Sequence, residues 1–265
     1  MKKLKSFFTS SPQPKEGPNK SVFFYTFHKC ASTLFATQVL NKSTSLSHKD
    51  IHAQAYENHK SEFNLSSSFV ENGFVYGPIR IIAKGSSPVA KLLAPVLDPA
   101  FVLDKSCLFM IRDPRDILIS SYFSFGFSHS FSANPDIKTR QLRTREKIQS
   151  QTIDHYALNN VNEIIEKFQL MNNLYNASSK SSILKYEDLI NDYAVFSNKL
   201  QAFMIFNKET LQTLFDESRP KSVENLSSHH RSGQVEGFRK HLTVDTIKEL
   251  NSQLSDILEQ FNYPT

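Results

Sequence analysis

The chain has 265 residues, a formal net charge of +5, two cysteines and only seven glycines. Apolar residues make up 39% and charged residues 22%, which supports a hydrophobic core and excludes an intrinsically disordered chain. Cys30 and Cys107 are too few for a disulfide framework or a four-cysteine zinc site, and no apolar run approaches the length of a membrane helix. The basic residues are scattered among 26 acidic ones. We therefore expect neither a nucleic-acid surface nor a membrane span.

The first twenty residues carry an early cluster of lysines, but Phe7 and Phe8 are followed at once by polar residues. A signal peptide needs an apolar stretch of about 7–15 residues after such a cluster. We therefore expect residues 1–20 to be a flexible leader, residues 21–265 to form the folded domain, and the protein to be cytoplasmic.

Short apolar segments alternate with segments of helical periodicity along the rest of the chain. Buried strands are predicted at Ser21–Phe27, Ile79–Ala83, Ser106–Ile111 and Ser182–Tyr186. Helices are predicted at Thr33–Asn41, Asp116–Phe125, Lys147–Tyr175, Asp188–Phe206, Lys208–Ser218 and Val244–Phe261. This alternation predicts right-handed strand–helix–strand units. The expected fold class is α/β, a single domain with a mostly parallel central sheet flanked by helices.

The first predicted strand runs directly into the segment His28–Thr33, where a helix begins. Unpaired backbone N–H groups and the positive end of the helix dipole make such a loop suited to a phosphate group. Lys29 adds a full charge, and the hydroxyls of Ser32 and Thr33 can donate hydrogen bonds. The loop is not a Walker A loop, and the G-x-G-x-x-G dinucleotide fingerprint is also absent. A serine helix cap beside a surface lysine explains the segment equally well.

Two later segments also combine basic residues with a helix start or a glycine-containing loop. Arg112 follows the predicted strand Ser106–Ile111 and is positioned for bidentate phosphate contact, with Ser120 eight residues later. Residues 229–242 hold two glycines among basic residues, a pattern that suits a backbone wrapped closely around an anion. Taken alone, an Arg–Asp pair at a turn and a polar connector explain these two segments as well.

These three segments, in this order, resemble the sulfotransferase family that uses 3′-phosphoadenosine 5′-phosphosulfate (PAPS) as the sulfuryl donor. The string RDPRDILISSYFS is close to the family's 3′-phosphate motif, ILKYEDL is similar to its Y-E-D-L strand end, and RSGQVEGFRKHLT resembles its late loop. The resemblance implies a P-loop-NTPase-like sulfotransferase fold, in-line transfer of a sulfuryl group to a hydroxyl or amine, and no metal. It implies nucleotide-binding roles for Lys29, Cys30, Ala31, Ser32, Thr33, Arg112, Ser120, Tyr186, Arg231, Ser232 and Gly233. Lys29 would also be catalytic, beside the leaving oxygen.

The sequence departs from the family pattern at several positions. Ser232 stands where the late loop usually has lysine, and Phe238 replaces its tryptophan. Leu34 replaces the aromatic residue that often stacks on adenine. The stretch after Ile79–Ala83 lacks the histidine that is catalytic in cytosolic members of the family.

A hydroxyl acceptor needs a proton acceptor within hydrogen-bond reach, so another base is required. Other branches of the family place a carboxylate just past the first helix, where this chain has Asp50 with His48 and His52 beside it. If this segment is a strand, residues 48, 50 and 52 share one face. The predicted base is therefore Asp50 or one of the two flanking histidines.

The expected acceptor is a small molecule or a carbohydrate, and its identity and the oligomeric state stay open. The aromatic run Tyr122–Phe131 is a candidate wall of an acceptor pocket, and the polar stretch Ser132–Ser150 is a candidate mobile lid. One alternative function is a kinase-like P-loop phosphotransferase, which needs a Walker loop and magnesium-binding carboxylates. Another is a non-catalytic nucleotide- or polyanion-binding module. The missing histidine favours that module, and the retained Lys29 argues against it.

Overall fold

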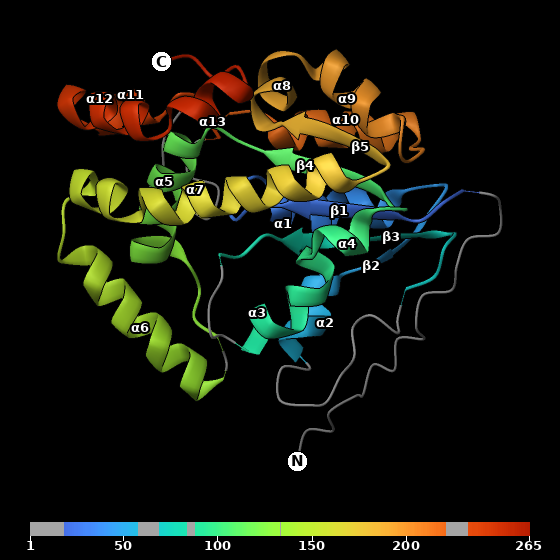
Figure 1. Ribbon diagram of the computed structural model, residues 1–265, viewed down its shortest axis with the longest axis horizontal. Coiled ribbons are helices and arrows are strands. Elements are labelled where there is room, and N and C mark those ends of the chain that lie inside the picture. Colours follow the sequence, from blue (N-terminus) through green and yellow to red (C-terminus); the bar gives the residue numbers. More distant parts are fainter. Residues whose placement is uncertain (1–18, 58–68, 84–87, 133, 221–232) are drawn as a thin grey trace.

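A central sheet of five parallel strands, in the order β2-β3-β1-β4-β5, organises the described part of the chain (Figure 1). The strands are β1 (Val22–Thr26), β2 (Ser47–Lys49), β3 (Phe74–Arg80), β4 (Ser106–Ile111) and β5 (Lys180–Lys185). This computed structural model describes residues 19–57, 69–83, 88–132, 134–220 and 233–265. The parallel sheet and its surrounding helices confirm the predicted α/β fold.

Helices cover the two faces of the sheet and surround its carboxyl edge. In the first half of the chain they are α1 (Ser32–Leu34), η1 (Phe35–Val39), η2 (Leu40–Lys42), α2 (Ile51–Glu57), α3 (Pro88–Leu93), η4 (Ala94–Leu97), α4 (Pro99–Val102), α5 (Pro114–Phe123) and η5 (Ser124–Ser128). In the second half they are α6 (Pro135–Gln149), α7 (Ile153–Ala177), α8 (Tyr186–Asn191), α9 (Tyr193–Gln201), α10 (Lys208–Ser218), α11 (Phe238–His241), α12 (Val244–Gln253) and α13 (Ser255–Gln260). None of the described helices is long and apolar enough to cross a membrane.

Both faces of β1 are covered, which explains why its sequence is almost entirely apolar or aromatic. Successive side chains of a strand point to opposite faces of the sheet. On one face the Tyr25 ring stacks on Phe109 of β4, and Phe109 in turn meets Tyr175 of α7. On the opposite face the Phe24 ring stacks on Phe35 of η1, with 4.9 Å between the ring centroids. Figure 1 shows α7 running across one side of the sheet.

Most of the predicted leader, residues 1–18, lies outside the described residues. Its last two residues contact the fold. Lys20 forms an isolated antiparallel bridge with Asn72, and the Asn19 carbonyl accepts the Gly73 N–H at 3.0 Å. The division of the chain at residue 20 stays a prediction.

The third strand differs from its prediction, since β3 spans Phe74–Arg80 and the sequence predicts Ile79–Ala83. Sequence rules interpret the Gly77–Pro78 pair as a turn, because proline has no N–H for the hydrogen-bond ladder. In the structure these two residues lie opposite the single residue Phe24 of β1, as a bulge that accommodates the proline. Gly77 has φ +154°, and a Cβ there would lie 2.6 Å from the Phe24 carbonyl oxygen, so this close approach requires glycine.

The predicted helix over Lys147–Tyr175 is divided between α6 and α7. The division has a local cause, because the Thr152 side chain accepts the His155 N–H and so caps a new helix. The predicted helix over Val244–Phe261 is likewise divided at Leu254 into α12 and α13.

The polar stretch Ser132–Ser150, expected as a mobile lid, contains helix α6. Asn134 caps this helix by accepting two backbone N–H groups of its first turn. Arg145 fastens α6 to the preceding segment by donating to the carbonyl oxygens of Phe125 and His129. Residues 135–149 are therefore a capped helix anchored to η5, and their role as a lid stays a prediction.

Candidate active site

Three strand ends meet one loop at the carboxyl edge of the sheet. β1 lies between β3 and β4, and the chain leaves β1 toward one side of the sheet and leaves β3 toward the other. Open parallel sheets bind ligands in the crevice at such a switch point. The loop between β1 and α1 occupies this place, with Arg80 at the end of β3 and Arg112 directly after β4.

The loop between β1 and α1 has a tight backbone. Lys29 and Ala31 have φ values of 70° and 55°, a conformation that residues other than glycine rarely adopt. Ala31 precedes helix α1 and offers no side-chain oxygen to the first N–H groups of the helix. Cys30 points into the core, and its complete burial raises the pKa of its thiol. The helix start therefore stays available to an anion.

Three cationic side chains converge on this loop. The Lys29 Nζ donates to the Ser124 Oγ of η5 at 2.7 Å. The Arg80 Nε donates to the Ser32 Oγ at 3.4 Å. The Arg112 Nη1 donates to the Lys29 carbonyl oxygen at 3.2 Å. Segments from β3, β4 and η5 thus hold residues 29–32 between them.

Two of these cations, Lys29 and Arg80, form no ion pair within the described residues, although the nearby charge of Asp50 offsets part of the effect of burial on the pKa of Arg80. Burial, followed by the charges of Arg112 and Arg80, lowers the pKa of Lys29 from its usual 10.5 to about 8. Burial also lowers the pKa of Arg80. Arg112, by contrast, pairs with Asp116 at 3.4 Å. An anionic ligand would stabilise the positive charge of Lys29 and Arg80.

Arg112 connects the first loop to the segment after residue 232. Its Nη2 donates to the Gln234 carbonyl oxygen at 2.8 Å, and its partner Asp116 accepts the Phe238 N–H at 3.0 Å. Because Nη1 reaches Lys29, one guanidinium bridges two segments that are about 200 residues apart in the chain. Its Nε is buried without a partner among the described residues.

Tyr186 adds a second connection to the late segment. Its hydroxyl donates to the Gly233 carbonyl oxygen at 2.8 Å, and its ring lies 4.3 Å from the guanidinium carbon of Arg112. Gly233 has φ +68°, the left-handed region in which glycine carries no steric penalty. The predicted Tyr186 and Gly233 therefore lie beside Arg112, as the sequence order suggests.

The other predicted nucleotide-binding residues are placed unevenly. Ser32 is buried under Arg80, whereas Thr33 is exposed on the first turn of α1. Ser120 lies half-buried on α5, the helix that begins directly after Arg112. The predicted Arg231 and Ser232 lie outside the described residues.

The three predicted base residues do not share a strand face. Strand β2 ends at Lys49, and helix α2 begins at Ile51, because the Asp50 carboxylate accepts the Ala53 N–H at 2.8 Å as a helix cap. The His48 Nε2 lies 2.6 Å from the Gly77 carbonyl oxygen.

His52 has a different environment. It is buried in the first turn of α2, and its ring centroid lies 6.2 Å from that of His28. His28 directly precedes Lys29. Of the three predicted base residues, His52 is therefore the one that the structure places in ring contact with the loop between β1 and α1.

Sequence reasoning missed three residues of this site. Arg80 lies inside the predicted strand Ile79–Ala83, whereas the structure places it at the end of β3. Ser124 stands in an aromatic run, and His28 stands one position before the motif lysine. The sequence signal for Arg80 is its position two residues after the Gly77–Pro78 pair. This signal indicates a strand end only if the strand is allowed to contain a bulge at that pair.

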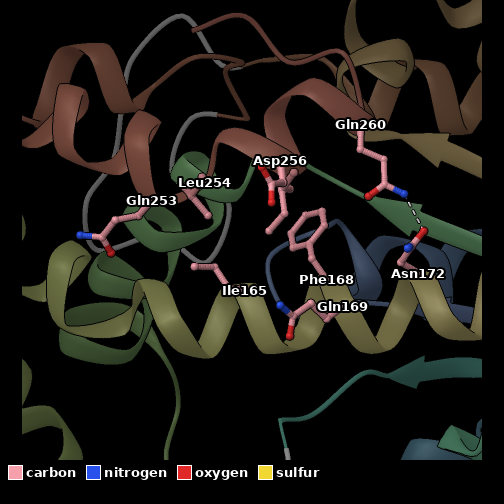
Figure 2. Close-up of a pocket in the computed structure, with 9 residues that line it drawn as sticks. Ile165, Phe168, Gln169, Asn172, Gln253, Leu254, Asp256 and Gln260 are labelled. Carbon is pink, nitrogen blue, oxygen red and sulfur yellow. Dashed lines mark hydrogen bonds between the residues drawn. The ribbon is translucent and has the colours of Figure 1, made fainter.

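A separate shallow groove of about 150 Å³ lies between α7 and the pair α12–α13 (Figure 2). The Gln260 amide spans it by donating to the Asn172 side-chain oxygen at 2.6 Å. Its lining is mostly uncharged and includes no residue of the first loop, so it does not have the character of an anion site. No cluster of metal-ligating side chains is found in the described residues.

Comparisons with known proteins agree with this geometry. A family model described as "Sulfotransferase domain" matches residues 24–261, which is most of the chain. The chain belongs to the sulfotransferase domain family. The match starts within β1, includes the loop between β1 and α1, and extends past the late segment held by Arg112, so the described site residues lie within it.

The fold of this sulfotransferase domain is shared with a solved sulfotransferase structure at low sequence identity. A mouse sulfotransferase, SULT7A1 complexed with PAP, is 10% identical with a TM-score of 0.56, and the match covers 90% of this chain and 84% of that one. A retinol dehydratase in a complex with retinol and PAP is 13% identical with a TM-score of 0.44, covering 90% and 81%. A comparison with curated protein sequences gives no match.

Proposed function

We propose that this sulfotransferase domain transfers the sulfuryl group of PAPS to a hydroxyl or amine of an acceptor by in-line displacement. The observation that carries the proposal is the convergence of Lys29, Arg80 and Arg112 on one loop at a helix start. PAPS presents a phosphosulfate and a 3′-phosphate, and these anions match the positive charge of the site. The PAP bound to the mouse relative supports the same nucleotide here.

Lys29 stabilises the leaving group, which is the 5′-phosphate of PAP. As the bond between sulfur and the bridging oxygen breaks, negative charge grows on the 5′-phosphate, and an ammonium group beside that oxygen lowers the barrier. The Lys29 Nζ is held by the Ser124 Oγ at 2.7 Å in the free protein. Ser32, Thr33 and the first N–H groups of α1 hold the 5′-phosphate, and the backbone of Cys30 and Ala31 lets it approach closely.

The 3′-phosphate binds on the other side of the site, between α5 and the late segment. Ser120, Gly233, Arg231 and Ser232 surround it in this proposal. Arg112 has a double role, because its Nη groups already hold the two loops together and its Nε remains without a partner in the described part of the chain. Tyr186, which stacks on Arg112, is then well placed for the adenosine side of the nucleotide.

The acceptor is proposed to be a small molecule or a carbohydrate that binds beside η5. The Phe125 ring of η5 lies 5.6 Å from the Lys29 Nζ and 6.0 Å from the His28 ring, so an aromatic wall borders the reacting end of the nucleotide. Arg145 anchors this wall to α6 through the Phe125 carbonyl oxygen. The wall is thus held rigidly.

Transfer from radiolabelled PAPS to a panel of phenols, alcohols, sugars and amines tests the proposal. We expect a labelled product whose mass exceeds that of the acceptor by one sulfuryl group. Transfer of phosphate from ATP with magnesium would favour the kinase-like function. Binding of PAP without product from any acceptor would favour a non-catalytic module.

The lowered pKa of Lys29 predicts a pH dependence of PAP binding. Because bound phosphate favours the charged ammonium, PAP binding raises the pKa of Lys29 above its free value of about 8. Below pH 8 the group is charged in both states and adds no pH dependence. Above pH 8 binding must take up a proton, so the Kd should rise with pH, by a few-fold in total and by no more than the effect of removing the Lys29 charge.

Calorimetry in two buffers of different ionisation enthalpy measures this proton uptake directly. We expect almost no proton uptake by Lys29 at pH 7.2 and clear proton uptake at pH 9. The variant Lys29→Met should lose the dependence. A Kd that is constant from pH 7.5 to 9.5 would show that Lys29 does not face the nucleotide.

Arg80, which the sequence analysis missed, is expected to contribute to nucleotide affinity. One charge-assisted hydrogen bond is worth about 1.5–3 kcal/mol, so Arg80→Met should raise the Kd for PAP about 10–100-fold. Lys91→Met on the exposed side of α3 is the matched control and should leave the Kd unchanged. Equal affinities of the Arg80→Met and wild-type proteins in a calorimetric titration would exclude this role.

A further inference from the structure

Two histidines outside the nucleotide-binding residues pack together next to Lys29. His28 lies in the loop between β1 and α1, directly before Lys29, and His52 lies in the first turn of α2. Their rings meet edge to face with centroids 6.2 Å apart, at an interplanar angle of 84°. The loop and α2 thus bring together two imidazoles that are 24 positions apart in the sequence.

The two histidines differ in their exposure. His52 is 7% exposed, and its Nδ1 is buried with no hydrogen-bond partner among the described residues. His28 has intermediate exposure and is less enclosed than His52. On its other side His28 meets the Phe125 ring at 6.0 Å, and the same Phe125 ring lies 5.6 Å from the Lys29 Nζ. His28 and the Lys29 Nζ therefore share Phe125 as a neighbour, and His52 contacts His28 from α2.

We propose that the imidazole of His28 accepts the proton of the attacking acceptor group, and that the buried His52 positions this imidazole. The inference rests on the proposed sulfuryl transfer and supplies the base that the reaction needs. It replaces the predicted Asp50, whose carboxylate is engaged as the cap of α2.

The acceptor O–H bond breaks as its proton moves to the imidazole nitrogen of His28, and the acceptor oxygen forms a bond to sulfur. The bond between sulfur and the bridging phosphate oxygen breaks at the same time, and its electron pair stays on PAP, where Lys29 neutralises the added charge. The imidazolium then releases its proton to water before the next turnover.

The charges around His28 keep its imidazole neutral in the free protein. Burial is the largest cause of its lowered pKa, followed by Arg80 of β3, His52 of α2, Lys167 of α7 and Lys29. Phe125, the neighbour from η5, carries no charge. A neutral imidazole has a free lone pair for the acceptor proton. When the donor binds, its negative charges offset those of Arg80 and Lys29 and raise the basicity of His28 during the reaction.

The variants His28→Gln, His28→Ala and His52→Gln test the proposal, with His155→Gln on the exposed side of α7 as the matched control. The probes are PAP in calorimetry and radiolabelled PAPS with the acceptor of the panel that gives the highest wild-type rate. His28→Gln should lower kcat about 10²–10⁴-fold and change the Kd for PAP less than about threefold. Free imidazole should restore part of the activity of His28→Ala.

His52→Gln should have a smaller effect on kcat than His28→Gln, about tenfold, and should change the pH profile of the remaining activity. Wild-type-like turnover of His28→Gln, or loss of PAP affinity in both His28 variants, would overturn the inference. A wild-type protein that binds PAP but transfers to no acceptor would overturn it as well. Failure of the wild-type protein to bind PAP would instead remove the proposed function itself.

Discussion

Replacing Lys29 with methionine is expected to lower kcat with PAPS by about 10²–10³-fold while changing the Kd for PAP much less. The ammonium group faces charge that appears mainly in the transition state, as the bridging oxygen takes the electron pair from sulfur. Ground-state binding relies more on Arg80, Arg112 and the helix start. Calorimetry with PAP and single-turnover assays with PAPS separate the two quantities. A large loss of PAP affinity with unchanged single-turnover rate would reverse the assigned roles.

The same replacement should stabilise the protein when no ligand is bound. Folding removes the Lys29 ammonium from water and places it beside two other cations, and its pKa falls from 10.5 to about 8. The folded state therefore binds fewer protons than the unfolded state between pH 8 and 10.5, and the charged lysine is destabilising below this window. A rise in Tm of about 2–4 °C, or about 1 kcal/mol, is expected for Lys29→Met at pH 7.

The Tm difference between this variant and the wild-type protein should shrink as the pH rises from 8 to 10.5. Lys91→Met is the matched control, since Lys91 is exposed on α3 and should leave the Tm unchanged at every pH. A Lys29→Met protein that melts below wild type at pH 7 would contradict the proposed electrostatic strain.

Arg112→Ala is expected to have the largest combined effect on stability and binding. The substitution leaves Asp116, whose side chain is 1% exposed, without its cation, and it removes the donors to the Lys29 and Gln234 carbonyl oxygens. Removing one partner of a buried ion pair lowers the free energy of unfolding by about 3–5 kcal/mol, which lowers the Tm by about 10 °C in a chain of this size. Because the two loops lose their connection, the Kd for PAP should rise about 100-fold or more.

A second substitution separates the two effects. Asp116→Asn in the Arg112→Ala background removes the unpaired carboxylate and should restore part of the Tm, but it should not restore PAP affinity. Arg112→Lys keeps the positive charge but lacks the planar guanidinium group, so this variant should bind PAP less tightly than the wild-type protein. Arg140→Ala on the exposed face of α6 is the matched control. Full PAP affinity in a folded Arg112→Ala protein would show that the loop connection is not needed.

The sequence predicts best where local signals and burial agree. Helix α10 has its predicted bounds, because Asn207 caps it and an apolar stripe faces the core. Strand β4 also matches its prediction, since a continuous apolar run needs cover on both faces and the structure supplies it. The loop between β1 and α1 and the late segment, which the sequence analysis groups with Arg112, both contact Arg112 in the structure.

The remaining differences arise from interactions between distant segments. The bulge opposite Phe24 lets β3 pass through Gly77 and Pro78, and no local rule predicts a partner strand that adapts in this way. Asp50 could be identified as a polar residue at a suitable distance from Lys29. Its use as a helix cap depends on where β2 ends, and a short edge strand leaves only a weak pattern.

The most direct test of the central claim is a calorimetric titration of the wild-type protein with PAP, set against ATP with magnesium. Our account predicts one PAP bound per chain, at least about 100-fold tighter than ATP, with an affinity that weakens as salt screens the three cations. No heat of binding with PAP, or equal affinities for the two nucleotides, would contradict it.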